Sequence, residues 1–266
     1  MPIVIMLASS LVIIGLVKVG LVPGIDRLSA SLGWSLKARG KATGYATSVP
    51  ELVTLVAAGL SGVWDAGLWN IASSNLLNLI FAATALVYYK RASTVFDMDF
   101  VKEIGFAAIG IAAPLTLMYF GLDTHVAIIP VLFVLFVAYL LVDKGDGATP
   151  EGQEVMGGTS PLVGLALIVG SLIAITIAGK FLGSATRDVV QLMGISALAA
   201  GWILGLITSL PEAVTFFTVF SVKRVFGSSD RKAQVQELLD NLAASNMSNS
   251  GLIYPLGLGL YLLGTR

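Results

Sequence analysis

The sequence is short of charge, cysteine and histidine. Only 12% of its 266 residues are Asp, Glu, Lys or Arg, whereas a soluble domain carries about 25%. So little charge cannot cover a soluble globule of this length, which excludes a soluble enzyme, a disordered chain and a nucleic-acid-binding protein. With no cysteine there is no disulfide framework and no thiolate metal site. The single histidine, His125, is predicted to lie near an outer helix end, which argues against zinc or copper.

The sequence is instead rich in long hydrophobic runs, and 56% of its residues are hydrophobic. Five stretches contain no Asp, Glu, Lys or Arg. Each is close in length to the ~20 residues that a helix needs to cross a bilayer. These stretches are 66–89, 104–122, 155–179, 189–211 and 241–265. None has the alternating pattern of a barrel strand. The sequence therefore predicts an all-α polytopic membrane protein.

The chain divides into about eight candidate transmembrane helices. We expect them at 3–22, 42–61, 65–89, 102–121, 124–142, 160–182, 189–222 and 233–263. The first is interpreted as a membrane helix and not as a signal peptide, because it lacks a basic n-region and a cleavage site. A Gly-rich, acidic linker at 143–160 separates a first half, 1–142, from a second half, 161–266.

The basic residues predict the orientation. With the N-terminus outside, 12 of the 16 Lys and Arg residues fall on the inner side, three fall on the outer side, and Lys18 lies within the first helix. This bias follows the positive-inside rule. We therefore expect both termini outside and a cytoplasmic linker.

An internal repeat connects the two halves. Residues 47–54 read T-S-V-P-E-L-V-T and residues 208–215 read T-S-L-P-E-A-V-T. A second block follows each, N-I-A-S-S-N-L-L-N at 70–78 and N-L-A-A-S-N-M-S-N at 241–249. Ten extra residues between the blocks of the second copy are expected to extend a loop in the charged segment 223–240. The layout inverts one copy relative to the other, which is typical of a secondary transporter with a midplane site.

Glu51 and Glu212 stand at equivalent positions within apolar segments. A charge at the bilayer centre costs roughly 2.5–3.5 kcal/mol on insertion scales, and such acids usually mark ion pathways. Pro50 and Pro211 precede them and remove the helical hydrogen bonds to carbonyls four residues back. A freed carbonyl in a membrane needs another partner, and a cation is one option.

Hydroxyl and amide side chains accompany both glutamates. Each alone is explained by helix back-bonding or interhelical packing. As a set, with the carboxylates and carbonyls, they predict an all-oxygen cage that suits hard cations such as Ca²⁺ and Na⁺. The side chains are Thr47, Ser48, Asn70, Ser74 and Asn78 in the first copy and Thr208, Ser209, Asn241, Ser245 and Asn249 in the second. Thr47 and Glu51 are spaced i,i+4, so we expect them to share a helix face. In each copy the Asn, Ser and Asn residues at i, i+4 and i+8 form one polar stripe on a helix.

These elements resemble the sodium/calcium exchangers of the cation/calcium antiporter superfamily. The two inverted alpha repeats of that family carry G-T-S-x-P-E and, downstream, G-S-N-x-x-N. The matching elements are A-T-S-V-P-E (46–51) with S-S-N-L-L-N (73–78), and I-T-S-L-P-E (207–212) with A-S-N-M-S-N (244–249). The corresponding repeats span 42–89 and 189–263.

The resemblance implies which residues bind the ions. Glu51 and Glu212 take the role of central Ca²⁺ ligands. The further implied ligands are Thr47, Ser48, Ser74, Asn78, Thr208, Ser209, Ser245 and Asn249, with the backbone carbonyls of Gly44 and Gly205. No cofactor is implied beyond the transported ions, which are Ca²⁺ and Na⁺, or H⁺ in a proton-coupled version.

The chain departs from the family pattern in two ways. Gly44 and Gly205 stand where the family usually has Ala, and Ala46 and Ile207 stand where it has Gly. The family usually has ten helices, whereas the second half here has room for three, so a homodimer is one arrangement that would supply the missing cover. The short linker lacks the regulatory insert of animal exchangers, which points to a prokaryotic-type plasma membrane protein.

The sequence thus predicts a secondary antiporter and not an enzyme. It would exchange Ca²⁺ for Na⁺ by alternating access, and the resemblance suggests that the first and sixth helices slide against the rest. Three alternatives stay open: a proton-coupled antiporter for Ca²⁺ or another divalent cation, a transport-inactive membrane scaffold that retains the repeat, and a channel.

Overall fold

The structure, a computed structural model, describes residues 1–32, 42, 45–142, 160–221 and 231–264. Every regular element in these ranges is a helix. Together with the apolar character of the helices, this confirms the predicted all-α membrane fold. Apart from Ser160, the predicted linker lies outside the described residues, and so does Gly44.

The first half begins with one continuous helix, made of α1 (Pro2–Leu16), a π-helical turn η1 (Val17–Leu21) and α2 (Val22–Ser31). It ends later than predicted, because its last turns are polar and do not appear in a hydrophobic run. The following elements are α4 (Val49–Leu60), α5 (Trp64–Tyr88), two 3₁₀ turns η2 (Ala92–Phe96) and η3 (Met98–Phe100), α6 (Val101–Tyr119) and α7 (Ile128–Val142).

The second half repeats this use of long and broken helices. It contains α8 (Pro161–Gln191), α9 (Ala197–Thr208), α10 (Leu210–Ser221), α11 (Arg231–Ser248), a second π-helical turn η4 (Asn249–Ile253) and α12 (Tyr254–Gly264). α8 extends beyond its predicted end, so the next helix starts only at Ala197, after a turn in which Gly194 has φ +68°. Residues 231–240 are the first turns of α11, which corrects the predicted loop extension across 223–240.

Both π turns stand directly before an X-Pro pair. Proline has no N–H to donate to the carbonyl four residues back. Pro23 follows η1, where Val22 N–H donates to the carbonyl of Val17, and Pro255 follows η4, where Tyr254 N–H donates to the carbonyl of Asn249. The wider turn therefore accommodates the proline without ending the helix.

Four helices are long and apolar enough to cross a membrane within the described ranges, and five if the bent pair α9–α10 forms one span. They are Pro2–Ser29, Trp64–Tyr88, Met98–Tyr119 and Pro161–Gln191, and the bend between α9 and α10 is 41°. The apolar helices Tyr45–Leu60 and Ile128–Val142 are shorter. The count of eight spans therefore stays a prediction.

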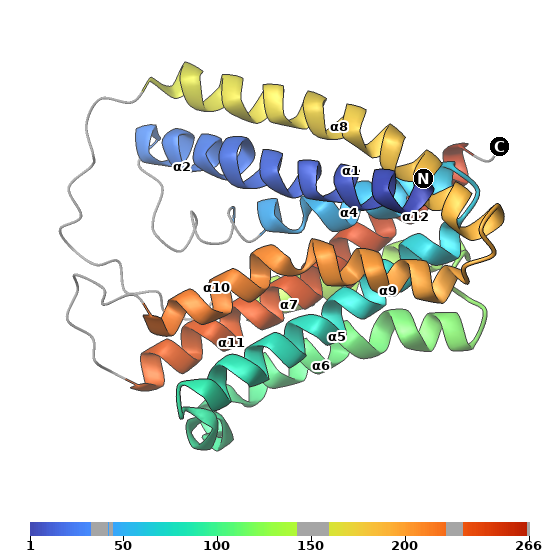
Figure 1. Cartoon of the computed structure of the whole chain (residues 1–266). Coiled ribbons are helices and arrows are strands. Elements are labelled where there is room, and N and C mark those ends of the chain that lie inside the picture. Colours follow the sequence, from blue (N-terminus) through green and yellow to red (C-terminus); the bar gives the residue numbers. More distant parts are fainter. Residues whose placement is uncertain (33–41, 43–44, 143–159, 222–230, 265–266) are drawn as a thin grey trace.

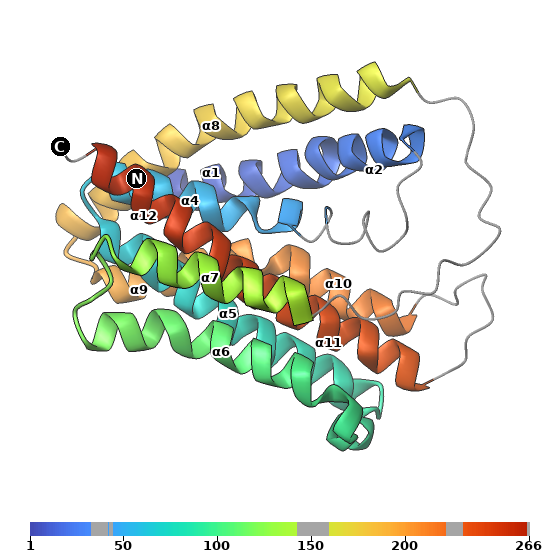
Figure 2. The same ribbon diagram turned by 180° about the vertical axis from the view of Figure 1, so that it is seen from behind.

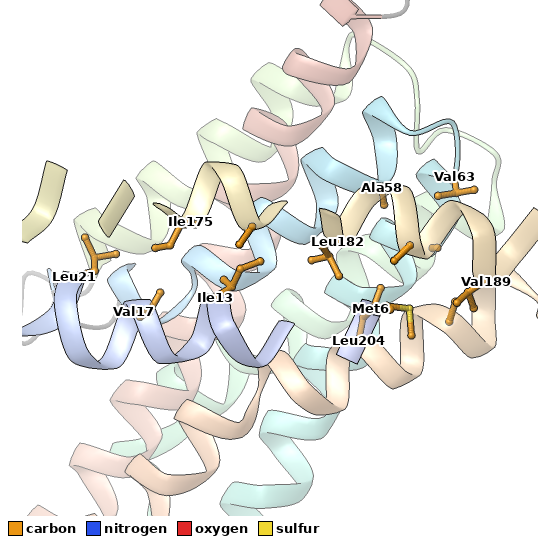
Figure 3. Packing of buried hydrophobic residues seen from close by; sticks show 14 of the residues in the cluster. Met6, Ile13, Val17, Leu21, Ala58, Val63, Ile175, Leu182, Val189 and Leu204 are labelled. Atoms are coloured by element: carbon orange, nitrogen blue, oxygen red, sulfur yellow. The ribbon is translucent and has the colours of Figure 1, made fainter. Parts of the chain in front are cut away.

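α1–α2 and α8 lie side by side along one flank of the bundle, and the other helices form the remainder (Figures 1 and 2). An apolar cluster joins that pair to α4 and α9 (Figure 3). Its members include Met6, Ile13, Val17 and Leu21 from the first helix, Ile175, Leu182 and Val189 from α8, Ala58 from α4 and Leu204 from α9. The start of α1 and the end of α12 lie at the same end of the bundle (Figure 1).

Polar contacts at the opposite end join α11 to the connection between α5 and α6. Lys232 forms an ion pair with Asp97 at 2.9 Å and another with Asp99, and Gln236 donates to Glu103 at 3.0 Å. The hydrogen bond from the Lys232 ammonium holds the pKa of Asp97 below its ordinary value, and the two aspartates raise the pKa of Lys232.

Candidate functional site

Both T-S-x-P-E elements form a break between two helical segments. Ser48 has φ −88° and ψ 1°, and Ser209 has φ −81° and ψ 0°, so the backbone leaves helical geometry in the same way in both copies. Pro50 and Pro211 occupy the first turns of α4 and α10. Each glutamate therefore lies in the first turn of a helix, where the positive end of the helix dipole favours a carboxylate.

The two carboxylates are buried and poor in hydrogen bonds. Glu51 is 0% exposed and Glu212 is 2% exposed. The Ser74 hydroxyl donates to Oε1 of Glu51 at 3.1 Å. Within the described part of the chain, Oε2 of Glu51 and both carboxylate oxygens of Glu212 have no hydrogen-bond partner. The two side chains are close enough for their charges to interact.

Each threonine lies beside the glutamate of the other copy. Thr208 lies beside Glu51. Thr47 lies beside Glu212. The i,i+4 spacing had suggested instead that Thr47 accompanies Glu51 on the same helix. The crossed arrangement joins the two copies into one site.

Ser74 is the centre of a group of oxygens. Its Oγ lies 2.8 Å from Oγ of Ser209 and 3.1 Å from Oγ1 of Thr208, in addition to its bond to Glu51. Thr208 in turn donates to Oδ1 of Asn70 at 3.1 Å. The predicted residues of the first polar stripe and of the second T-S-x-P-E element thus meet at one place, between α5 and the α9–α10 break.

The two asparagines at the ends of the stripes present their amides in the same sense. Asn78 donates through Nδ2 to Oγ of Ser245 at 3.0 Å and to Oδ1 of Asn246 at 3.3 Å. Asn249 donates through Nδ2 to Oδ1 of Asn75 at 2.9 Å. Among the described residues, the Oδ1 atoms of Asn78 and Asn249 have no donor. The nitrogen of each amide is thus fixed by a neighbour and its oxygen is left for another partner.

Five of the buried oxygens that lack a donor within the described protein belong to predicted ligands, and we call these five the oxygen cage. They are Oε2 of Glu51, Oε1 and Oε2 of Glu212, and Oδ1 of Asn78 and Asn249. A buried polar atom left without a partner costs about 1–3 kcal/mol. Carboxylate and amide oxygens are the donors that Ca²⁺ and other hard cations prefer. No group of three or more His, Cys, Asp or Glu side chains gathers in the described ranges, so the donor set rests on two carboxylates and neutral oxygens.

Gly205 lies beside Ser74, next to the cage. Its carbonyl accepts the Ser209 N–H at 3.0 Å and lies 3.5 Å from Oγ of Ser74. A Cβ at this position would lie 2.0 Å from Oγ of Ser73, so glycine here allows α9 to pack closely on α5. Gly44, its predicted counterpart, lies outside the described residues.

Two buried asparagines that hold helices together, Asn75 and Asn246, were not among the residues predicted from the sequence. Asn75 donates to the carbonyl of Gly110 at 2.8 Å and to Oγ of Ser250 at 3.0 Å, and Asn246 donates to the carbonyl of Asn75 at 3.2 Å. Both are the first Asn of the repeated S-N-x-x-N block, so their identity in the two copies was the available signal. They were missed because they do not share the i,i+4 stripe.

No curated protein and no solved structure matches the chain. The family described as sodium/calcium exchanger protein matches it over residues 2–143 and 163–263. These two segments include both T-S-x-P-E elements, both S-N-x-x-N elements and every residue of the oxygen cage. The chain belongs to the sodium/calcium exchanger family.

Proposed function

We propose that this protein is a secondary antiporter that exchanges Ca²⁺ for Na⁺ by alternating access, with the ions bound at the oxygen cage. Membership of the family already gives cation/calcium exchange across a membrane. The observation that carries the finer proposal is the set of buried carboxylate and amide oxygens without a donor, contributed at equivalent positions by two sequence repeats. Two carboxylates supply the two negative charges that match one Ca²⁺.

The crossed contacts between the copies support a single site that both halves must form. Thr208 beside Glu51 and Thr47 beside Glu212 mean that a shift of one half relative to the other changes both pairs. A cation bound between the glutamates interacts with both halves, and it favours whichever arrangement gives it more oxygens. Overlapping sites for Ca²⁺ and Na⁺ then make exchange obligatory.

The helix pair α1–α2 and α8 is the proposed moving part. The cluster that joins it to α4 and α9 consists of apolar side chains (Figure 3). Such contacts are non-directional and allow one surface to slide over another with little change in buried area. The rest of the bundle carries the cage and stays fixed in this scheme.

The proposed orientation has the N-terminus outside. The end of α2, the end of α5 and the start of α11 lie at the end of the bundle away from the start of α1 (Figure 1). These segments carry or adjoin Arg27, Lys90, Arg91 and Lys232. The positive-inside rule assigns that end to the cytoplasm of a prokaryotic-type cell. A homodimer remains part of the proposal, with a second chain covering the face for which the family has two more helices.

The test is calcium uptake by the purified protein in liposomes. Sodium-loaded vesicles diluted into sodium-free buffer should accumulate Ca²⁺. Glu51→Gln and Glu212→Gln should each lower uptake about 100-fold or more, because removing one partner of a buried charge contact costs ~3–5 kcal/mol. Glu103→Gln is the matched control and should transport normally, since Glu103 bonds Gln236 away from the cage.

The other outcomes separate the alternatives. Uptake that is undiminished in both glutamate variants would refute the assignment of the cage. Uptake that follows a pH gradient and ignores sodium would replace Na⁺ by H⁺ in the proposal. Flux without any counter-ion would indicate a channel, and a wild-type protein that binds no Ca²⁺ would indicate a scaffold.

A further inference from the structure

The buried asparagines Asn75 and Asn246 each accept a hydrogen bond from a cage amide of the other repeat. Asn249 donates through Nδ2 to Oδ1 of Asn75 at 2.9 Å. Asn78 donates through Nδ2 to Oδ1 of Asn246 at 3.3 Å. All four side chains are buried. The first Asn of each S-N-x-x-N element is therefore an acceptor for the last Asn of the other element.

Asn75 is itself held in one orientation by a group that can only accept hydrogen bonds. Its Nδ2 donates to the backbone carbonyl of Gly110 on α6 at 2.8 Å and to Oγ of Ser250 at 3.0 Å. A carbonyl has no proton to donate, so the atom of Asn75 that faces it must be the amide nitrogen. The amide oxygen of Asn75 therefore points to Asn249, and only the NH₂ group of Asn249 can donate to it.

Asn246 is anchored in the same way. Its Nδ2 donates to the backbone carbonyls of Asn75 at 3.2 Å and Ala107 at 3.4 Å, so its Oδ1 faces Nδ2 of Asn78. The Ser245 hydroxyl also accepts from Asn78 at 3.0 Å. Because a hydroxyl can equally donate to an amide oxygen, it does not distinguish the two ends of an amide. The acceptor oxygen of Asn246 therefore selects the orientation of Asn78.

We propose that Asn75 and Asn246 are positioning residues for ion binding, which fix the amides of Asn249 and Asn78 so that each presents its oxygen, and not its NH₂ group, to the cation. A reversed amide would place N–H groups where the cation needs an oxygen. The orientation is set by backbone carbonyls of α6, a helix that lies outside both repeats.

This inference rests on the proposed function, because the cation that it concerns is the transported one. Groups that orient a metal ligand without touching the metal typically change metal affinity by about 10–100-fold when they are removed. Asn75→Ala should weaken Ca²⁺ binding by about this factor, because Asn249 loses the acceptor of its amide nitrogen and can rotate. Asn75→Asp should not weaken it, because either oxygen of an aspartate accepts from Asn249.

The experiment compares purified wild type with Asn75→Ala, Asn75→Asp and Ser250→Ala. Ser250→Ala is the matched control. It removes a buried hydroxyl that bonds both Asn75 and the Gly110 carbonyl, but it leaves Asn75 anchored at that carbonyl. Ca²⁺ affinity is measured by calorimetry in detergent, and the melting temperature is measured without Ca²⁺ on the same samples. The two readouts separate a loss of amide orientation from a loss of stability.

The variant Asn249→Asp provides a second background for the same comparison. An aspartate at this position has no NH₂ group to orient, and its oxygen faces the fixed Oδ1 of Asn75. Removing Asn75 then relieves a contact between two acceptors. Asn75→Ala should therefore weaken Ca²⁺ binding in the wild-type background and should not weaken it in the Asn249→Asp background.

We expect Asn75→Ala to bind Ca²⁺ more weakly, while Asn75→Asp and Ser250→Ala bind at least as tightly as wild type. Equal weakening in Ser250→Ala or in Asn75→Asp would overturn the inference and leave the proposed function intact, since the loss would then follow from packing. Equal weakening by Asn75→Ala in both backgrounds would also overturn it. If Asn75→Ala does not fold, Asn246→Ala and Asn246→Asp make the same comparison at Asn78. If wild-type protein binds no Ca²⁺, the proposed function fails, and the inference fails with it.

Discussion

The close contact between Gly205 and Ser73 gives a prediction that is worked from distances. An alanine Cβ at position 205 would lie 2.0 Å from Oγ of Ser73 and 3.1 Å from the carbonyl oxygen of Asn70. The Ser73 hydroxyl lies 3.2 Å from the carbonyls of both Asn70 and Gly201 and donates to them. In Gly205→Ala this hydroxyl must therefore rotate away or α9 must separate from α5.

The expected magnitude follows from three contributions. Overpacking of a close contact costs about 1–3 kcal/mol, and the lost Ser73 hydrogen bond costs about 1 kcal/mol. Replacing glycine by alanine in a helix returns up to ~1 kcal/mol. Gly205→Ala should therefore lower the free energy of unfolding by ~1–3 kcal/mol. Ser73→Ala should lower it by ~1 kcal/mol, because only the hydrogen bond is lost.

The double variant Ser73→Ala/Gly205→Ala is the decisive measurement. Removing the hydroxyl makes room for the new methyl group, and the lost hydrogen bond is then offset by the helix propensity of alanine, so the double variant should be close to wild type in stability. Because the single changes sum to ~2–4 kcal/mol, the coupling energy should be ~2–4 kcal/mol. Thermal unfolding in detergent measures the cycle. Ca²⁺ binding should follow the same order, because Ser74 is next to Ser73 and bonds Glu51. Effects that add within ~0.5 kcal/mol would refute the contact, since independent sites behave that way.

Two further predictions concern residues that are not themselves members of the cage. Asn75→Ala should lower the unfolding free energy by ~2–4 kcal/mol, because it removes the hydrogen bonds to the Gly110 carbonyl and to Ser250 and leaves buried groups without partners. The half-buried Asn241 provides the control variant Asn241→Ala. A melting temperature of Asn75→Ala as high as that of this control would contradict the structural role of Asn75. The pKa of Asp97 is lower when folded, so the ion pair with Lys232 stabilises above the ordinary Asp pKa of about 3.9 and this stabilisation is lost as pH falls through the lower folded value. The loss of melting temperature on acidification below about pH 4 should be smaller in Lys232→Ala, and identical acid profiles would show that the pair has no effect.

Local patterns in the sequence predicted the cage better than they predicted the contacts between its parts. The scarcity of charge singled out Glu51 and Glu212, and both are buried. The backbone breaks at Ser48 and Ser209 follow from the prolines two residues later, which is a local effect. The pairing of Thr208 with Glu51 is not local, because it depends on how α9–α10 packs against α4 and α5.

Helix ends and close contacts between helices also could not be predicted from the sequence. The hydrophobic runs marked where α8 is apolar, but its helical hydrogen bonds continue through the polar residues Arg187 and Asp188. Gly110 lies within a long apolar helix with no turn signal. Only the structure reveals that α11 passes so close that a Cβ there would lie 2.8 Å from the backbone of Asn246. That approach is what lets Asn75 and Asn246 join α5, α6 and α11.

The hydrogen bonds that fix the amide nitrogens of Asn78 and Asn249 also keep the amide oxygens of these residues without a donor, which is unfavourable for stability. Nδ2 of Asn78 and Nδ2 of Asn249 are fixed by scaffold residues, so rotating either amide to satisfy its oxygen would break the bonds that its nitrogen makes. Five buried oxygens without donors would cost about 5–15 kcal/mol at about 1–3 kcal/mol each. That is comparable to the whole stability of a typical domain. The fold can therefore bear this arrangement only if a cation, a proton or water meets these oxygens, and under the proposed function the transported ion is that partner.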